Sequence, residues 1–170
     1  MTNTREQIFG TISRRPGIHF NELVRRLELA PGQVQYHVKR LVREDRIVRE
    51  ACFGRTHHFP CGVDGADRQV IALLRRETPR AIVTKVLEVD SIERRALAAD
   101  LDLAESTVSY HLDRLEEAGV IDIDYVPGSP ARIRVDDPVS VIPLLSLTSR
   151  ELPATLTDRL ERLIDDLLEE

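Results

Sequence analysis

Residues 34–41 read VQYHVKRL, and residues 108–115 read VSYHLDRL. The two stretches lie 74 residues apart, and the match extends without a gap on both sides of them. The apolar residues that match across the same offset are Ile18, Leu23, Leu27, Leu29 and Ile47 with Ile92, Leu97, Leu101, Leu103 and Ile121. Self-similarity at a fixed offset indicates an internal repeat. We therefore interpret the chain as two copies of one structural unit, copy 1 within residues 1–62 and copy 2 within residues 79–136.

Each copy has the pattern of three short helices followed by a β-hairpin, because apolar residues recur at helical spacing and then alternate. In copy 1 we expect helices at 4–13, 20–27 and 32–44 and strands at 46–53 and 56–59, with a turn at Gly54-Arg55. In copy 2 we expect helices at 79–89, 93–101 and 105–118 and strands at 120–125 and 131–135, with a turn at Pro127-Gly128. A helix at 67–77 occupies most of the linker, residues 63–78. The predicted fold class is mainly α with small β-hairpins.

A further signature follows residues 108–112: Leu115 and then the string EAGVI at 117–121. Together they resemble the recognition-helix signature of arsenic-repressor-like and multiple-antibiotic-resistance-like winged-helix DNA-binding domains. With Asp137-Pro138 opening a C-terminal section at 137–170, the whole arrangement is similar to tandem winged helix-turn-helix transcriptional regulators of archaeal, in particular haloarchaeal, type. The resemblance implies two winged helix-turn-helix domains in tandem plus a C-terminal helix. Ala30 and Ala104 depart from it, since relatives carry a Ser or Thr helix cap there.

Charge is unevenly divided along the chain, although its net value is −5. Residues 1–80 carry 15 Lys and Arg against 9 Asp and Glu, a net charge of +6. Residues 81–170 carry 9 against 20, a net charge of −11. The basic half favours double-stranded DNA as its partner, and the acidic half indicates a different partner.

On a helix at 32–44, the side chains opposite the apolar stripe form a candidate DNA-reading face. Its members are Gly32, Tyr36, Lys39, Arg40 and Arg43, with Gln35 on its margin. In the hairpin, Arg46 lies in the first strand and Arg55 lies beside Gly54 at the tip, where an arginine suits the minor groove. Arg25 and Arg26 are further candidates for contacts to the DNA backbone. The alternatives are a basic face that is merely solvated and an Arg55 that is only a polar turn residue.

The corresponding face of copy 2 differs in charge. Asp113 stands where copy 1 has Lys39, and Glu117 stands where it has Arg43. The candidate DNA contacts of copy 2 are Ser109, Tyr110, Arg114, Arg132 and Arg134. Because carboxylates on this face repel phosphates, scaffolding a dimer or docking a partner is an equal alternative for copy 2.

Four residues of the first hairpin and its base offer the ligand types that zinc prefers: Cys52, His57, His58 and Cys61. Their spacing is not that of a zinc knuckle, and the hairpin places Cys52 near its tip and Cys61 near its base. We therefore expect no metal and no cofactor, with a zinc site and a redox-sensing thiol as the alternatives. His37 and His111 lie at equivalent positions beside the core side of a helix, which indicates packing. Because no nucleophile–base set and no phosphate-cradling glycine loop is apparent, we expect no enzyme.

The C-terminal section begins with an apolar segment at 139–147, which we expect Pro143 to interrupt. The final helix, 154–170, has leucines at spacings of 4, 3 and 4: Leu156, Leu160, Leu163 and Leu167. This stripe predicts a homodimer, with packing inside one chain as the alternative. Since no apolar run approaches the length of a membrane span and the N-terminus lacks a signal-peptide pattern, we expect a cytoplasmic protein without a membrane partner.

Taken together, the patterns predict a sequence-specific, double-stranded DNA-binding transcription regulator that binds mainly through copy 1. The alternative is a winged-helix protein-interaction module of the transcription or replication machinery. The basic face of copy 1 and Arg55 favour the DNA-binding function over the alternative.

Overall fold

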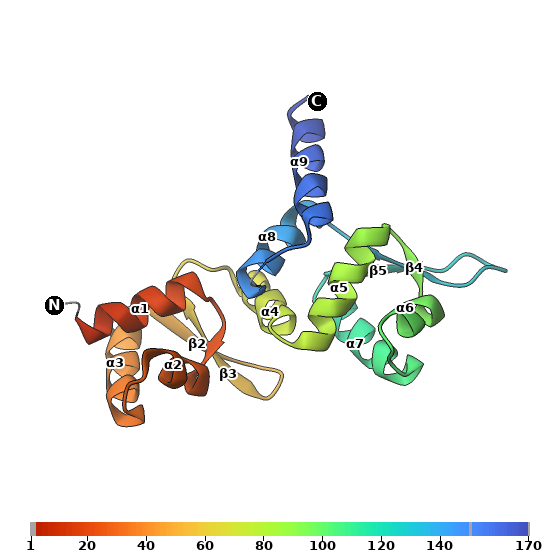
Figure 1. The fold of residues 1–170 in the computed structure, drawn as a ribbon. Coiled ribbons are helices and arrows are strands. Elements are labelled where there is room, and N and C mark those ends of the chain that lie inside the picture. The colour runs from red at the N-terminus through yellow and green to blue at the C-terminus, as the bar shows by residue number, and fades with distance from the viewer. Residues whose placement is uncertain (1–2, 150, 170) are drawn as a thin grey trace. The chain divides into compact units, whose positions relative to one another are not determined.

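The structure is a computed structural model that describes residues 3–149 and 151–169. The chain divides into two compact units, Met1–Ala72 and Leu73–Glu170, which contain copy 1 and copy 2 respectively. Helices alternate with short antiparallel strands (Figure 1), which confirms the mainly α fold class with small hairpins. Within the described ranges, none of the helices combines the length and the apolar character that crossing a bilayer requires.

The first unit combines helices with a three-stranded sheet. Its elements are α1 (Thr4–Arg14), β1 (Ile18–His19), α2 (Phe20–Leu27), α3 (Pro31–Arg43), β2 (Ile47–Cys52), β3 (Arg55–Pro60) and α4 (Gly65–Leu74), within which the unit boundary falls. The strand order is β1-β3-β2, and neighbouring strands are antiparallel. The sequence did not predict β1, because two residues are too few for an alternating pattern to be recognised.

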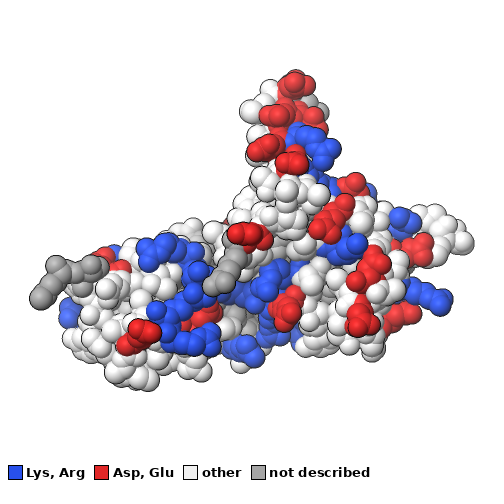
Figure 2. All heavy atoms as spheres, in the orientation of Figure 1, with Lys and Arg blue, Asp and Glu red and all other residues white. Residues whose placement is uncertain are grey.

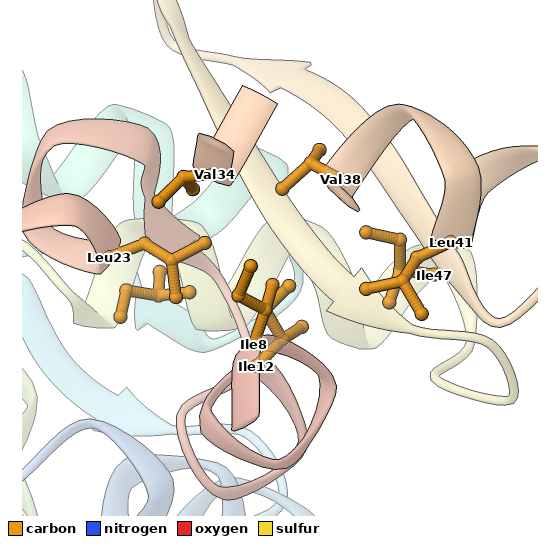
Figure 3. Close-up of a cluster of buried hydrophobic side chains, with 8 residues drawn as sticks. Ile8, Ile12, Leu23, Val34, Val38, Leu41 and Ile47 are labelled. Carbon is orange, nitrogen blue, oxygen red and sulfur yellow. The ribbon is translucent and has the colours of Figure 1, made fainter. Parts of the chain in front are cut away.

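Buried aliphatic side chains from α1, β1, α2, α3 and β2 form the core of the first unit (Figure 3). They are Ile8, Ile12, Ile18, Leu23, Val34, Val38, Leu41 and Ile47. Val34, Val38 and Leu41 recur at helical spacing along α3, so they lie on one side of it. Burying each such side chain stabilises the fold by about 1.5–3 kcal/mol. This stripe fixes the rotation of α3 about its own axis.

The second unit repeats this order and then extends it. Its elements are α5 (Glu77–Val89), β4 (Ile92–Glu93), α6 (Arg94–Asp100), α7 (Glu105–Glu117), β5 (Ile121–Asp124), β6 (Arg132–Val135), α8 (Pro138–Thr148) and α9 (Ala154–Leu168). The strand order is β4-β6-β5, which is the order of the first sheet. β4 pairs Ile92 with Ile133, just as β1 pairs Ile18 with His58. The repeat inferred from the sequence is therefore a structural repeat.

The third helix of each copy starts without a side-chain cap, as the alanines in the sequence indicate. Ala30 precedes α3 and Ala104 precedes α7, and neither provides a capping hydrogen bond. Pro31 at the first position of α3 favours the helical start in another way, because its φ is already fixed near the helical value. By contrast, the side chain of Asn3 caps α1 and accepts a 3.0 Å hydrogen bond from the backbone N–H of Arg5.

The turn of the first hairpin differs from the expected Gly54-Arg55. Phe53 and Gly54 form it, with φ values of 51° and 76°. Two successive positive φ values are those of the tight turn that suits the twist of a hairpin. Arg55 is therefore the first residue of β3, opposite Cys52 in the register, and does not lie at the tip.

Helix boundaries around Pro79 also differ from the sequence expectation. α4 ends at Leu74, and α5 already begins at Glu77. Pro79 is the third residue of α5, where a backbone N–H has no acceptor inside the helix, so the proline costs no hydrogen bond there. The next helix of the second copy starts later than expected. Glu93, the first residue of the helix predicted at 93–101, belongs to β4, and α6 begins at Arg94.

The expected interruption at Pro143 is wrong, because α8 continues through it as one helix. Asp137 caps α8 by accepting hydrogen bonds from the backbone N–H groups of Val139 and Ser140, at 3.1 and 3.3 Å. Proline removes one donor from the second turn. The burial of Ile142 and neighbouring apolar side chains offsets that loss.

The first half of α9 belongs to the second unit. Leu156 is fully buried, whereas Leu160 and Leu163 are half-buried. Arg159 connects α9 to the end of α5, since it donates to the carbonyl oxygen of Leu87 and pairs with Asp90. Leu156 therefore serves this unit's own core and is not available to a dimer seam. The side chain of Leu167 lies outside the described part of the structure.

Two buried histidines hold β1 against β3. His57 and His58 are 1% and 2% exposed. The Nδ1 atom of His57 lies 2.8 Å from the carbonyl oxygen of Gly17, and that of His58 lies 3.0 Å from the carbonyl oxygen of Ile18. In each pair the ring N–H donates to the carbonyl, because a carbonyl oxygen can only accept. The two imidazoles thus attach the hairpin to the segment before α2.

We expect His58 to make the first unit sensitive to acid. Burial lowers the pKa of His58, the hydrogen bond to Ile18 opposes this shift, and the charges of Arg49 and His19 add to it. The unfolded chain then takes up the proton first, so the contribution of His58 to stability is complete above about pH 6.5 and is lost as the pH falls below it.

The test is urea unfolding at about pH 7.5 and about pH 5.5, on either side of that unperturbed pKa. Acidification should lower the free energy of unfolding more in the parent than in His58→Asn, whose amide keeps a donor near Ile18 but does not titrate. An equal loss in both proteins would contradict the assignment.

Candidate nucleic-acid interface

The residues predicted for the outer face of α3 are all exposed, and all except Gln35, which lies at its margin, are on the side opposite the buried stripe. They are Gly32, Gln35, Tyr36, Lys39, Arg40 and Arg43. The structure therefore brings the predicted candidates on α3 together on one helix face. Lysine and arginine on an exposed helix face can neutralise phosphates or reach guanine edges in a major groove.

Tyr36 and Arg40 form a pair within this face. The Arg40 guanidinium donates a 3.2 Å hydrogen bond to the Tyr36 hydroxyl and lies 5.8 Å from the centre of its ring. This hydrogen bond raises the pKa of Arg40, and Glu44, 3.8 Å away, adds a smaller effect in the same direction. Glu44 also pairs with Arg5 at 2.6 Å, so the last turn of α3 is partly neutralised. Within the described residues, Arg40 is thus paired with Glu44, whereas none of the ion pairs engages Lys39 or Arg43.

The structure does not place Arg46 at this face. Its two terminal nitrogens bind both carboxylate oxygens of Glu6 on α1, at 2.6 and 3.0 Å, and its guanidinium lies 3.9 Å from the ring centre of Phe9. The hydrogen bond from Arg46 lowers the pKa of Glu6. Arg46 thus connects the start of β2 to α1, and we withdraw it as a candidate contact.

Arg55 lies instead in a cleft between the start of α2 and the hairpin. The cleft has a volume of about 600 Å³, and its lining residues are His19, Phe20, Asn21, Glu22, Arg25, Arg55 and Thr56. It brings together Arg25 and Arg55, which are both exposed. Arg26 is engaged elsewhere, in a 2.8 Å ion pair with Glu22. Asn21 also lines this cleft. The sequence pattern did not indicate this, because β1, the short strand that brings the start of α2 beside β3, was not predicted.

The cysteines and histidines that resemble zinc ligands are dispersed by the fold. Cys52 is buried near the tip of the hairpin and Cys61 is exposed at its base. His57 and His58 direct Nδ1 at backbone carbonyls of the β1 segment. Burial raises the pKa of Cys52, which disfavours its thiolate form. These positions do not assemble a metal centre.

His37 and His111 occupy equivalent places on α3 and α7 and are half-buried. Each ring meets the preceding tyrosine edge-on, with ring centres 5.1 Å apart for Tyr36 and 5.0 Å apart for Tyr110. Burial lowers the pKa of His111, and the charges of nearby arginines add to that effect. The packing interpretation of these histidines is consistent with both observations.

The outer face of α7 has the same tyrosine–arginine pair as α3, but the residues around the pair differ. The Arg114 guanidinium lies 4.5 Å from the ring centre of Tyr110, which is 49% exposed. Ser109 is half-buried and accepts a 3.1 Å hydrogen bond from Arg94. Asp113 is exposed where α3 has Lys39, so this face carries far less positive charge.

The hairpin arginines of the second unit are neutralised by carboxylates. Arg134 lies 3.5 Å from Asp122 and 3.0 Å from Asp124. Arg132 lies 3.7 Å from Glu93 and donates a 3.0 Å hydrogen bond to the Ser91 hydroxyl. In the view of Figure 2, acidic side chains also predominate on α9. The charge difference between the two halves of the sequence is therefore also present when α3 is compared with α7 and the first hairpin with the second.

Comparison with known proteins agrees with this architecture. Residues 2–71 match a family model described as an N-terminal HTH domain, and residues 95–122 match the model of the bacterial regulatory proteins of the arsR family. The chain is also 29% identical, over 122 residues, to an uncharacterized HTH-type transcriptional regulator of Methanocaldococcus jannaschii. That alignment covers 71% of this chain but 30% of the relative. On its fold and these matches, the chain is a tandem winged helix-turn-helix protein similar to an archaeal HTH-type transcriptional regulator.

Proposed function

We propose that the chain is a transcription regulator that binds double-stranded DNA sequence-specifically, mainly through copy 1. The observation that carries the proposal is the outer face of α3, where Lys39, Arg40 and Arg43 are exposed opposite the buried stripe. A helix of this kind fits the major groove, where lysine and arginine bind phosphates and guanine. The family matches support the same function, since helix-turn-helix domains occur in transcriptional regulators.

The remaining candidates of copy 1 have separate roles in this proposal. Gln35 and Tyr36 lie on the α3 face and can contact base edges, glutamine by pairing with adenine. Arg25 and Arg55 share the cleft beside the hairpin and hold the adjacent backbone or enter the minor groove. Within the described residues, no ion pair engages Arg55, in contrast to Arg132 and Arg134 of the second hairpin.

Copy 2 is better suited to a partner other than DNA. Asp113 and Glu117 on α7 are exposed, and both would face phosphates if α7 docked as we propose for α3. Tyr110 and Arg114 remain as its candidate DNA contacts. The second candidate function is therefore an interaction module, in which copy 2 binds a component of the transcription machinery.

The internal repeat supplies its own test of the DNA-reading face. Lys39→Asp with Arg43→Glu gives α3 the charges of α7, and the fold should persist because both side chains are exposed. Affinity for duplex DNA should fall about a hundredfold or more, and the slope of log affinity against log salt should shrink by about 1 for each phosphate that the variant no longer neutralises. Fluorescence anisotropy at matched salt, with a random duplex and with duplexes selected for binding, measures both.

The reciprocal change, Asp113→Lys with Glu117→Arg, is the matched control on α7. It should leave affinity nearly unchanged if copy 2 serves a partner, and it should raise affinity if copy 2 lies against the duplex. Should the altered α3 bind as tightly as the parent while circular dichroism shows it folded, copy 1 is not the principal reader.

We further propose that the protein is a homodimer through the outer part of α9. Ile164 and Leu168 are 42% and 79% exposed on a helix whose first half packs on its own unit. Half-buried Leu160 and Leu163 continue the stripe. A two-fold dimer suits a winged-helix regulator, because it matches two half-sites about 34 Å apart on the DNA.

Ile164→Asp with Leu168→Asp should convert this dimer to a monomer, because two carboxylates would replace apolar contacts in the seam. Sedimentation velocity of both proteins measures the change. Arg162→Asp is the control, since Arg162 is exposed on the side of α9 opposite the stripe, and it should leave the mass unaltered. A parent that sediments as a monomer would contradict the homodimer, and a double variant that sediments like a dimeric parent would place the seam elsewhere.

A further inference from the structure

The second unit contains a cleft that lies outside the proposed DNA-reading face of copy 1. It has a volume of about 240 Å³ and lies between the start of α6, the exposed side of α7 and the β5–β6 hairpin. Its walls are formed by residues from all three elements, among them Arg95, Ser109, Asp113, Ile123 and Ala131. The first unit has its cleft at the equivalent place, so the two can be compared position by position.

A substitution between the repeats changes the apolar content of this corner. In the first unit Phe20, at the start of α2, packs its side chain against the buried core. The equivalent residue of the second unit is Arg94, whose guanidinium extends instead to the Ser109 hydroxyl, 3.1 Å away. The start of α6 therefore lacks the aromatic ring that Phe20 supplies in the first unit, and the aromatic residue that lines the cleft is Tyr125, from the hairpin loop.

The floor of the cleft in the second unit is apolar. Leu112 and Ile133, which are 3% and 1% exposed, both line it, together with Ile123 and Ala131. An apolar cavity of about 150 Å³ is enough to hold benzene. A cleft of about 240 Å³ thus has room for a branched or aromatic side chain and a small polar end group.

The rim of the cleft carries charges of both signs. Arg94 and Arg95 lie on it at the start of α6, and Glu105 and Asp113 lie on it along α7. Glu93 of β4 also lines the cleft, but its carboxylate is paired with Arg132 at 3.7 Å. Within the described residues, none of the ion pairs engages Arg95, Glu105 or Asp113. A simple anion would meet carboxylates here, and a simple cation would meet guanidinium groups. A ligand with a positive group, a negative group and an apolar chain can pair with the charges of both signs and cover the apolar floor.

We propose that this cleft binds a free L-amino acid with a bulky apolar side chain, of the class of leucine, isoleucine and phenylalanine. The side chain lies on Leu112 and Ile133, the carboxylate faces Arg94 and Arg95, and the ammonium group faces the carboxylates of α7. Charge-assisted hydrogen bonds of this kind are the stronger ones in proteins. Copy 2 is then a ligand-sensing repeat beside a DNA-reading repeat. Binding to this cleft needs no DNA, so it is tested independently of the proposed function.

Isothermal titration calorimetry of the full chain with L-phenylalanine, L-leucine and L-isoleucine is the first experiment. At least one should bind with saturable 1:1 stoichiometry per chain. For the L-amino acid that binds most tightly, its C-terminal amide and its deaminated acid should each bind about tenfold more weakly or worse, because each lacks one charged partner. Glycine, without the apolar chain, should not bind. If none of the three amino acids binds at millimolar concentration, or if both analogues bind as well as the parent ligand, the proposal is wrong.

Two variants locate the site. Arg95→Ala should weaken binding about tenfold, whereas Asn21→Ala, at the equivalent position of the first unit, should leave it unchanged. Ala131→Phe should abolish binding by filling the cleft from the hairpin side, and thermal unfolding should confirm that it remains folded. Binding that survives both Arg95→Ala and Ala131→Phe would place the ligand outside this cleft and overturn the assignment.

Discussion

The burial of one side of α3 is the constraint on which the interface of the first unit depends. Val34, Val38 and Leu41 are at most 2% exposed, and turning the helix by one residue, about 100°, would bring at least one of them into water. Everything on the opposite side is positioned by that fact, including the direction in which Lys39 and Arg43 extend. In α7 the buried residues Val108, Leu112 and Leu115 fix the orientation of the helix in the same way. The residues on the outer face of each helix are not held by the core, so they can differ between the two repeats.

The two repeats share this architecture and diverge in what they present to solvent. The first places cations on α3 and two arginines in the cleft beside its hairpin. The second has carboxylates on α7 and holds its hairpin arginines in ion pairs. The pairing of His19 with His57 in one sheet becomes the pairing of Glu93 with Arg132 in the other. One fold thus provides a surface for a polyanion in the first unit and a mixed-charge cleft in the second.

Much of this arrangement could be predicted from the sequence, because a helix of three turns carries enough apolar positions to show its period. The helices, the repeat and the outer face of α3 follow from that period. Features that depend on tertiary contact could not be predicted. Arg46 meets Glu6 across forty residues of chain, and β1 is recognised only by its pairing with β3. Phe53 at a positive φ was unexpected because a bulky side chain rarely adopts it.

The two hairpins also differ in how their strands are joined, and this affects how the protein can be engineered. In the first, Cys52 faces Arg55 across a two-residue turn, so any inserted residue disturbs the register. In the second, the loop at 125–131 begins with Tyr125 and Val126, which are 76% and 59% exposed. Lengthening a loop costs free energy only in proportion to the logarithm of its length. An epitope or a fluorescent reporter can therefore be inserted within residues 127–129 of the second loop, between the cleft-lining residues Tyr125 and Pro130, while α3 and its surroundings stay intact.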